Sequence, residues 1–514
     1  MNRREFLQFL GVSGVLATLP GCSTQSSFSS SSLPHLPPSL DDKLLTVDGL
    51  DYKILIRWGD QINKTQMFGY NNDFIAFHPL TNDRGILWVN HEYVSPLFIN
   101  GEERTKENVD LELLEVGGSL LEVKMTNGEW NVVKDSSYNR RLDGNTQIPF
   151  AWDKKIAGSE IAIGTMGNCA GGYTPWGTIL TCEENYDMFW GDRNRNGKSI
   201  EKSWVQWDKF YSRAPEHYGW VVEVEPLTGK SKKLVSLGRC AHECAAVTKS
   251  KTGKIIAYTG DDSAYEHLYK FISDTNDSLE KGKLYVANLE KGQWISLHRE
   301  DQPILMKHFK DQTEIQVFTR EAAKLVGATP LDRPEDIEFD PLTGNVLITL
   351  TNNKTNKNYH GSILKIMEDN NDPGSLTFKH GTFLTGGKEH NFACPDNMIF
   401  DPKGNLWFTT DISGGDINKG QYEGFGNNGL FVFLRSGPHQ GEVIRIASAP
   451  VDAELTGPCF SPDYKTLFLS VQHPGEYSES LSKLSSHWPD GGKPKPVVVT
   501  LSGPVLDKIV NGTL

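Results

Sequence analysis

Residues 334–353 read PEDIEFDPLTGNVLITLTNN, and residues 395–411 read PDNMIFDPKGNLWFTTD. Each stretch contains a short apolar strand, a turn with proline and glycine, a second apolar strand and a closing group of Asn or Asp residues. This order is typical of a β-hairpin. Because two separate stretches repeat it, the sequence predicts a fold built from repeated hairpins.

The same order recurs four more times, with less regular spacing. These copies begin near Asp73, Asn168, His242 and Gly457. The second strand of a hairpin returns to the end where the first began, so the polar residues that open and close each hairpin share one end of the sheet. Six such hairpins predict an all-β fold, a six-bladed β-propeller with a polar site at one mouth. The irregular spacing predicts inserted loops and short helices over one face.

An alternative explanation for the polar strand ends is that Asp and Asn only mark turns there. Glu92, Glu243 and Glu335 occupy the same ends, however, and glutamate is a poor turn former. We therefore interpret these strand ends as ligand positions.

The composition is typical of a large folded protein. Of its 514 residues, 38% are hydrophobic and 23% are charged, which allows a large core. The chain has 65 acidic and 52 basic residues, a net charge of −13, and no basic stretch long enough to follow a phosphate backbone. We therefore expect no nucleic-acid partner. The acidic surplus fits a solvated surface or a protein that binds cations such as calcium.

The N-terminus carries an export signal. Arg3 and Arg4 precede a modestly apolar stretch over residues 9–19, which predicts a twin-arginine signal peptide over residues 1–21. The twin-arginine export machinery is then an expected partner. The apolar stretch is too short to span a bilayer stably. We expect the mature chain to be periplasmic or at the cell surface, either released or held by a lipid anchor at Cys22.

The rest of the chain divides into two parts. Residues 22–42 are rich in Ser and Pro, which predicts a flexible tether. Residues 43–514 contain all six hairpins, which predicts a single β-propeller catalytic domain.

Residues with metal-binding or catalytic chemistry lie at the predicted mouth. Cys182 precedes two glutamates, which indicates either a mixed sulfur and carboxylate metal site or a structural cysteine in a buried strand. His-Glu pairs at residues 91–92 and 242–243 occupy two strand ends. Arg333 lies beside acids, where an arginine forms a salt bridge or clamps a phosphate.

Two other patterns are less specific. Residues 192–197 alternate oxygen-bearing side chains and end in glycine, as a calcium loop does, but Ser203 stands where the closing glutamate is expected. An ordinary polar turn explains this stretch equally well. The seven cysteines show no paired zinc spacing, so we expect no disulfide scaffold.

Several short motifs, taken in order, resemble the motif series of the PhoX alkaline phosphatases, and the resemblance runs from about residue 45 to about residue 480. The predicted twin-arginine signal also fits this family. The motifs are Asn90-His91-Glu92-Tyr93, Thr181-Cys182-Glu183-Glu184-Asn185, Gly238-Arg239 with Ala241-His242-Glu243, Gly260-Asp261-Asp262, Arg333-Pro334-Glu335-Asp336, Cys394-Pro395-Asp396-Asn397 and Val471-Gln472-His473-Pro474-Gly475.

This resemblance implies a metal-dependent enzyme that hydrolyses small phosphate monoesters outside the cytoplasm, with two Fe³⁺ ions and several Ca²⁺ ions on the propeller axis. It implies that Arg333 binds the phosphate oxygens and that a metal-bound oxygen is the nucleophile. The implied iron ligands are Cys182, which bridges the two ions, with Glu92, Glu243 and Glu335; the implied calcium ligands include Asp262 and Asp396. The chain departs from the family pattern at Cys240 and Cys244, where apolar residues are expected.

Two other functions compete with this interpretation. Other six-bladed propellers carry an axial calcium ion, so a calcium-dependent lactonase or ester hydrolase is one alternative. Such a site needs neither Cys182 nor Arg333. A non-enzymatic, metal-stabilised surface propeller is the other.

Overall fold

The computed structural model describes residues 33–101 and 103–514, of which residues 34–514 form one compact unit. The predicted signal peptide and Cys22 lie outside the described residues. Within the described residues, no helix has the length and apolar character needed to cross a membrane.

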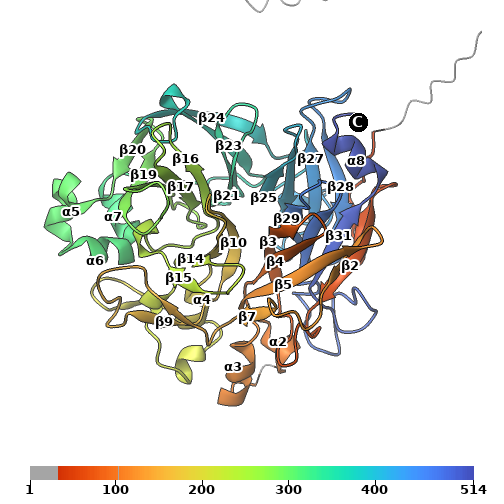
Figure 1. Cartoon of the computed structure of the whole chain (residues 1–514), viewed down its shortest axis with the longest axis horizontal. Coiled ribbons are helices and arrows are strands. Elements are labelled where there is room, and N and C mark those ends of the chain that lie inside the picture. Colours follow the sequence, from red (N-terminus) through yellow and green to blue (C-terminus); the bar gives the residue numbers. More distant parts are fainter. Residues whose placement is uncertain (1–32, 102) are drawn as a thin grey trace, which may run out of the picture. The chain divides into compact units, whose positions relative to one another are not determined.

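Six antiparallel sheets form the blades of a β-propeller (Figure 1). One strand of each blade lies innermost and contacts the innermost strands of both neighbouring blades, which closes a ring. The predicted six-bladed propeller is therefore confirmed. The inner strands are β3 (Asn72–Thr81), β10 (Asn168–Tyr173), β16 (Ala246–Lys249), β21 (Pro334–Phe339), β25 (Pro395–Phe400) and β29 (Glu454–Phe460).

Each predicted hairpin joins an inner strand to the second strand of its blade. The turns that follow β21 and β25 contain Gly344 and Gly404, whose φ angles of 73° and 76° are left-handed and favour glycine. The second strands are almost completely buried, which explains why their sequences are nearly continuous apolar runs. They are β4 (Arg84–His91), β11 (Ile179–Glu183), β17 (Ile255–Gly260), β22 (Val346–Leu350), β26 (Leu406–Thr410) and β30 (Leu467–Gln472).

Additional strands complete the outer part of each blade. Their side chains fill the layers between neighbouring sheets, where the apolar clusters lie. They are β5 (Gly117–Thr126), β6 (Glu129–Val132), β7 (Arg140–Leu142), β14 (Val221–Val224), β15 (Ser231–Lys233), β18 (Leu268–Ser273), β19 (Gly282–Asn288), β20 (Gln293–Ser296), β23 (Ser362–Glu368), β24 (Phe378–Thr385), β27 (Gly429–Phe433) and β28 (Val443–Ser448).

The two ends of the described chain close the ring together. Strand β2 (Asp51–Arg57) pairs with β31 (Val497–Ser502), which lies next to β30 in the same blade. Strand β1 (Leu45–Thr46) pairs with β28 in the preceding blade. Because the partners are far apart in sequence, these pairings close the propeller with backbone hydrogen bonds between its two ends.

Insertions between strands contain the short helices, as predicted. Two further hairpins, β8–β9 and β12–β13, lie among them. The insertions comprise α2 (Pro96–Ile99), α3 (Lys106–Glu112), β8 (Gln147–Pro149), β9 (Ile161–Ile163), α4 (Asp187–Trp190), β12 (Asp192–Arg193), β13 (Ser199–Glu201), α5 (Pro303–His308), α6 (Gln312–Val317) and α7 (Thr319–Leu325), and α8 (Pro504–Val510) follows the last strand.

The predicted tether differs from the structure in its C-terminal part. Residues 34–42 belong to the compact unit. The Leu36 N–H donates to the Arg445 carbonyl at 2.9 Å, and the Asp42 carboxylate accepts from Ser486 Oγ at 2.6 Å. The prediction of a flexible tether is therefore wrong for these residues, because their polar groups find partners on the propeller that the local sequence does not reveal.

Candidate metal centre

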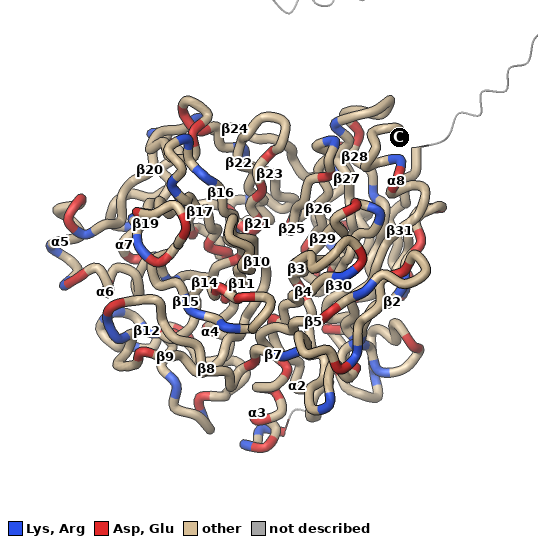
Figure 2. The backbone as a smooth tube through the Cα atoms, in the orientation of Figure 1, with Lys and Arg blue, Asp and Glu red and all other residues tan. Residues whose placement is uncertain are grey.

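An acid-lined pocket of about 140 Å³ lies at the end of the axis where the inner strands begin. Figure 2 shows acidic positions beside β10, β11 and β21, toward the centre of the ring. The lining residues are Asp73, Glu92, Tyr93, Cys169, Glu184, Asn185, Glu243, Asp262, Arg333, Glu335, Asp396, Asp411, Glu454, Thr456, Gln472 and His473.

Four inner strands contribute the residue at their second position to this pocket: Asp73, Cys169, Glu335 and Asp396. In each of these strands the register with the second strand shifts between the first and the fourth residue, so the second residue lies within a β-bulge or a similar irregularity. A bulge bends a strand and changes where its side chains point. The repeated irregularity therefore explains how four blades aim equivalent side chains at one point on the axis.

Cys169 is the centre of the acid cluster. Its Sγ lies 3.1 Å from Asp73 Oδ2 and 3.2 Å from Glu243 Oε1. It belongs to two groups of potential metal ligands, one with Asp73 and Glu92 and the other with Glu184 and Glu243, and the ligand atoms of each group lie within 4.8 Å of one another. One sulfur is thus shared by both groups of potential ligands.

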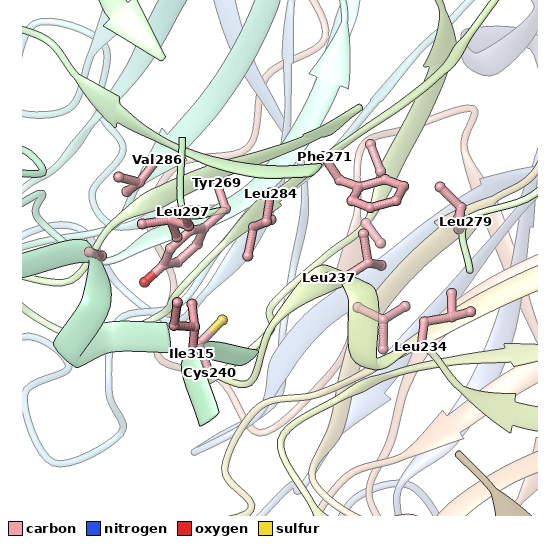
Figure 3. Packing of buried hydrophobic residues seen from close by; sticks show 14 of the residues in the cluster. Leu234, Leu237, Cys240, Tyr269, Phe271, Leu279, Leu284, Val286, Leu297 and Ile315 are labelled. Carbon is pink, nitrogen blue, oxygen red and sulfur yellow. The ribbon is translucent and has the colours of Figure 1, made fainter. Parts of the chain in front are cut away.

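The structure brings six of the seven predicted site residues to the pocket, and Cys182 is the exception. The six are Glu92, Glu243, Asp262, Arg333, Glu335 and Asp396. Cys182 is fully buried in an apolar cluster, of which Figure 3 shows Cys240, Leu284 and Ile315. Cys182 lies on β11, the second strand of its blade. Its neighbour Thr181 donates to Asn90 Oδ1. Because adjacent residues on a strand point to opposite faces, Cys182 points away from Asn90. The structure therefore does not bring Cys182 to the pocket, and Cys169 is the cysteine that lines it.

Further lining residues had no assigned role in the sequence analysis. A signal for one was present, because Cys169 occupies the same strand position as Glu335 and Asp396. Gln472 Nε2 donates to Glu92 Oε2 at 2.6 Å and so holds that carboxylate in place. The residues without an assigned role are Asp73, Tyr93, Cys169, Glu184, Asn185, Asp411, Glu454, Thr456, Gln472 and His473.

Arg333 is held rigidly at the edge of the pocket. Its Nε and Nη2 donate to the two carboxylate oxygens of Asp262 at 2.9 and 2.8 Å, and Nη2 also contacts Glu335 at 2.8 Å and Asp411 at 3.4 Å. Among the described residues, these contacts all use Nε or Nη2, so Nη1 is available to another anion. The φ of Arg333 is 57°, a left-handed value that is unusual for a residue with a side chain. Such strain is typical of functional positions.

The pocket contains far more negative than positive groups. Burial raises the pKa of Glu92 to about 7, and burial together with the Asp411 charge raises that of Asp396 to about 8. Burial and neighbouring acids raise the pKa of Glu243 well above its usual range. The Glu335 Oε2 atom is buried and has no partner among the described residues. Nine carboxyl groups around one arginine and one histidine therefore fit a site for multivalent cations.

These pKa shifts predict how stability depends on pH when metal is removed. The pKa values of Glu92 and Asp396 in the folded state exceed their ordinary values of 4.5 and 3.8. At any pH between the ordinary and the folded pKa of either group, the native state therefore binds more protons than the unfolded state. Stability must then fall as pH rises through that window. We expect the melting temperature of chelated protein to decrease from about pH 5 to about pH 8. Calorimetry with and without restored metal checks this; a chelated protein that gains stability with pH contradicts it.

The other sequence patterns have structural explanations. Neither His91 nor His242 lines the pocket. His91 Nε2 lies 2.7 Å from Ser119 Oγ, and His242 Nε2 lies 2.7 Å from the Gly238 carbonyl, so both imidazoles have structural partners. Residues 192–197 form the turn region of the β12–β13 hairpin. Asp192, the first residue of β12, pairs with Arg239 at 3.0 Å. An ordinary polar turn is therefore the better explanation of the calcium-like pattern.

The chain is similar to proteins of known family and structure. A family model described as alkaline phosphatase PhoX matches residues 32–475. The structure of Pseudomonas fluorescens PhoX in complex with vanadate, a transition state analogue, has 30% sequence identity and a TM-score of 0.83, covering 94% of this chain and 99% of that one. A gluconolactonase from Xanthomonas campestris has 11% identity and a TM-score of 0.38, covering 92% of this chain and 99% of that one. This last likeness is too weak to support a function. No curated protein matches the chain.

Proposed function

Because the chain belongs to the alkaline phosphatase PhoX family and is a phosphatase, we propose that the pocket on the propeller axis is its active site and binds metal ions together with a phosphate monoester. The observation that carries this proposal is the position of Cys169, which both groups of potential metal ligands share. The vanadate complex of the Pseudomonas fluorescens protein supports it, since that ligand is described as a transition state analogue.

We assign two Fe³⁺ ions to the Cys169 cluster. A thiolate is a soft ligand that suits transition metals, and carboxylates supply the hard oxygen ligands. Asp73 and Glu92 would hold one ion and Glu184 and Glu243 the other, and Cys169 would be a ligand available to both because it belongs to both groups. Glu335, Asp262 and Asp396 line the remaining wall, where we place the Ca²⁺ ions. This moves Glu335 from the iron ligands that the resemblance implies to the calcium ligands, because neither group of potential ligands around Cys169 includes it.

Arg333 binds the substrate in this proposal. Its Nη1 is free of the contacts that hold Nε and Nη2, so it can donate to a phosphoryl oxygen while Asp262 keeps the guanidinium plane fixed. Multivalent cations, when bound, neutralise phosphoryl oxygens and activate an oxygen nucleophile. The pocket has a volume of about 140 Å³ and is lined mainly by charged and polar groups, which suits the phosphoryl group of the ester.

Turnover of p-nitrophenyl phosphate by the exported protein tests this function. We expect activity at alkaline pH, loss of activity on chelation, and recovery as calcium is added back, because the carboxylates of the pocket need cations to accept an anionic substrate. A simple lactone assayed in parallel provides the control. Lactone hydrolysis without phosphate ester hydrolysis, from folded and metal-loaded protein, contradicts the proposal.

We also propose that the protein acts in the periplasm or at the cell surface. Arg3, Arg4 and the apolar stretch that follows them support export through the twin-arginine machinery. This machinery carries folded proteins, which suits a metal centre assembled before export. Cys22 is the position for a lipid anchor if the chain is tethered.

A further inference from the structure

Tyr477 is a half-exposed aromatic residue in the loop that follows β30. It lies four residues after His473, which lines the axial pocket, and 49% of it is exposed. The family match ends at residue 475, so the comparison gives Tyr477 no role. Single exposed hydrophobic residues are common on protein surfaces, so any role for this one has to be argued from its contacts.

The neighbouring loop after β26 holds the Tyr477 ring in place. A Cβ atom at Gly414 would lie 2.6 Å from Cε2 of the ring, and one at Gly415 would lie 3.4 Å from Cε1. The close approach at position 414 therefore requires glycine. The hydroxyl groups of Tyr477 and Ser413 lie 3.2 Å apart and share a hydrogen bond. The ring is thus fixed against this loop, while about half of the residue stays exposed.

The contact with Ser413 places the ring near Arg333. Ser413 lies two residues after Asp411, and two residues span at most about 7 Å. Asp411 lines the axial pocket and contacts Arg333 Nη2 at 3.4 Å. Tyr477 is therefore on the side of the pocket where Arg333 holds the phosphoryl group in the proposed function.

A second set of contacts gives the same position. Glu476, the residue before Tyr477, accepts a hydrogen bond from Tyr93 Oη at 2.7 Å, and Tyr93 lines the pocket. The Tyr477 N–H donates to Asp452 Oδ2 at 3.4 Å. The Asp452 carbonyl in turn lies 2.9 Å from His473 Nδ1. Contacts from three loops therefore hold Tyr477 at the rim of the axial pocket.

The rim and the pocket offer different surfaces to a substrate. Charged and polar groups line most of the pocket, which suits the phosphoryl group of an ester. Tyr477 adds an exposed aromatic ring beside it. Two aromatic rings attract each other beyond the effect of the apolar area that they bury, and a puckered aliphatic ring has no π face for this contact.

We propose that Tyr477 selects phosphate monoesters whose alcohol is a flat aromatic ring. The aromatic ring of the ester packs on Tyr477 while its phosphoryl group lies at Arg333. This inference rests on the proposed function and deepens it, because it names the class of ester and a residue that contacts the leaving group.

Turnover of phenyl phosphate and cyclohexyl phosphate by the exported, metal-loaded protein tests the inference. The two alcohols have the same number of carbon atoms, but only phenol is flat and aromatic. Because the two esters differ in intrinsic reactivity, each variant is compared with wild type on the same ester. We expect Tyr477→Leu to lower kcat/KM about tenfold for phenyl phosphate and less than about threefold for cyclohexyl phosphate.

Two control variants separate this role from a structural one. Tyr477→Phe keeps the ring, so we expect it to keep the wild-type ratio of the two kcat/KM values. Tyr52→Leu removes a tyrosine that is 37% exposed on β2 and does not line the pocket, and we expect wild-type values for both esters. Metal content is measured on every sample.

The possible failures can be told apart. A wild-type protein that is folded and metal-loaded but hydrolyses neither ester contradicts the proposed function, and the inference about Tyr477 falls with it. If wild type hydrolyses both esters and Tyr477→Leu lowers both values equally or leaves both unchanged, only the inference about Tyr477 is overturned. Loss of the phenyl preference in Tyr477→Phe as well would show that the hydroxyl group, and not the ring, is responsible, which also overturns it.

Discussion

Cys169→Ser is expected to lose phosphatase activity by more than about a hundredfold, together with its iron. Cys169 Sγ is the ligand atom shared by both groups of potential metal ligands, so the substitution affects two ions at once. A serine hydroxyl is a hard, weakly acidic donor that does not replace a thiolate bridge. Turnover of p-nitrophenyl phosphate and iron content per chain, measured on the same preparation, check the result.

Cys182→Ala is the matched control for this prediction. Cys182 is fully buried among apolar residues and does not line the pocket. We therefore expect this variant to keep its iron and its turnover, with at most a modest loss of stability from the missing packing. The reverse pattern, in which Cys182→Ala loses iron and Cys169→Ser keeps full activity, would reject the assignment of Cys169.

Arg333→Lys has the second largest expected effect, a loss of about 10²–10³ in kcat/KM. Arg333 uses Nε and Nη2 to hold Asp262 and keeps Nη1 for the substrate. A lysine has one compact ammonium group and cannot make these contacts in two directions. Separate measurement of kcat and KM, with metal content verified, checks the result.

Asp262→Asn tests the positioning of Arg333, with calcium content measured on the same sample because Asp262 also lines the wall where we place calcium. The asparagine keeps the size of the side chain but removes the charge that pairs with Arg333 at 2.8 Å. We expect a smaller loss of kcat/KM than in Arg333→Lys, with the remaining turnover still dependent on calcium. An Arg333→Lys enzyme that matches wild type, with full metal content, would show that Arg333 does not bind the phosphoryl group.

The blade hairpins could be predicted because each carries its signals locally. The apolar runs of β22 and β26, with a glycine turn before each, define strands and their direction without knowledge of the rest of the chain. Six local patterns of the same kind then allow only a few closed arrangements. The acidic character of the mouth follows as well, because Glu335 and Asp396 open their strands.

The identity of the shared cysteine was not predictable from local pattern alone. Cys182 stands beside two glutamates in sequence, but strand alternation and its place on β11 direct it into an apolar cluster. Cys169 reaches the axis through a register shift at the start of β10, and an irregularity of this kind leaves little trace in sequence. Comparing equivalent strand positions between the blades would have selected Cys169.

The remaining features that could not be predicted from the sequence depend on pairings between distant segments. The pairing of β2 with β31 and the packing of residues 34–42 on the propeller join segments that are hundreds of residues apart. No local pattern specifies such contacts, because they depend on the closed ring.

Diffraction at the iron absorption edge, from crystals of protein purified after native export, tests the central claim most directly. The account predicts two anomalous peaks in the axial pocket, both within bonding distance of Cys169 Sγ and flanked by Asp73, Glu92, Glu184 and Glu243. A single peak, peaks bound to Cys182, or a catalytically active crystal with no iron signal in this pocket would contradict it.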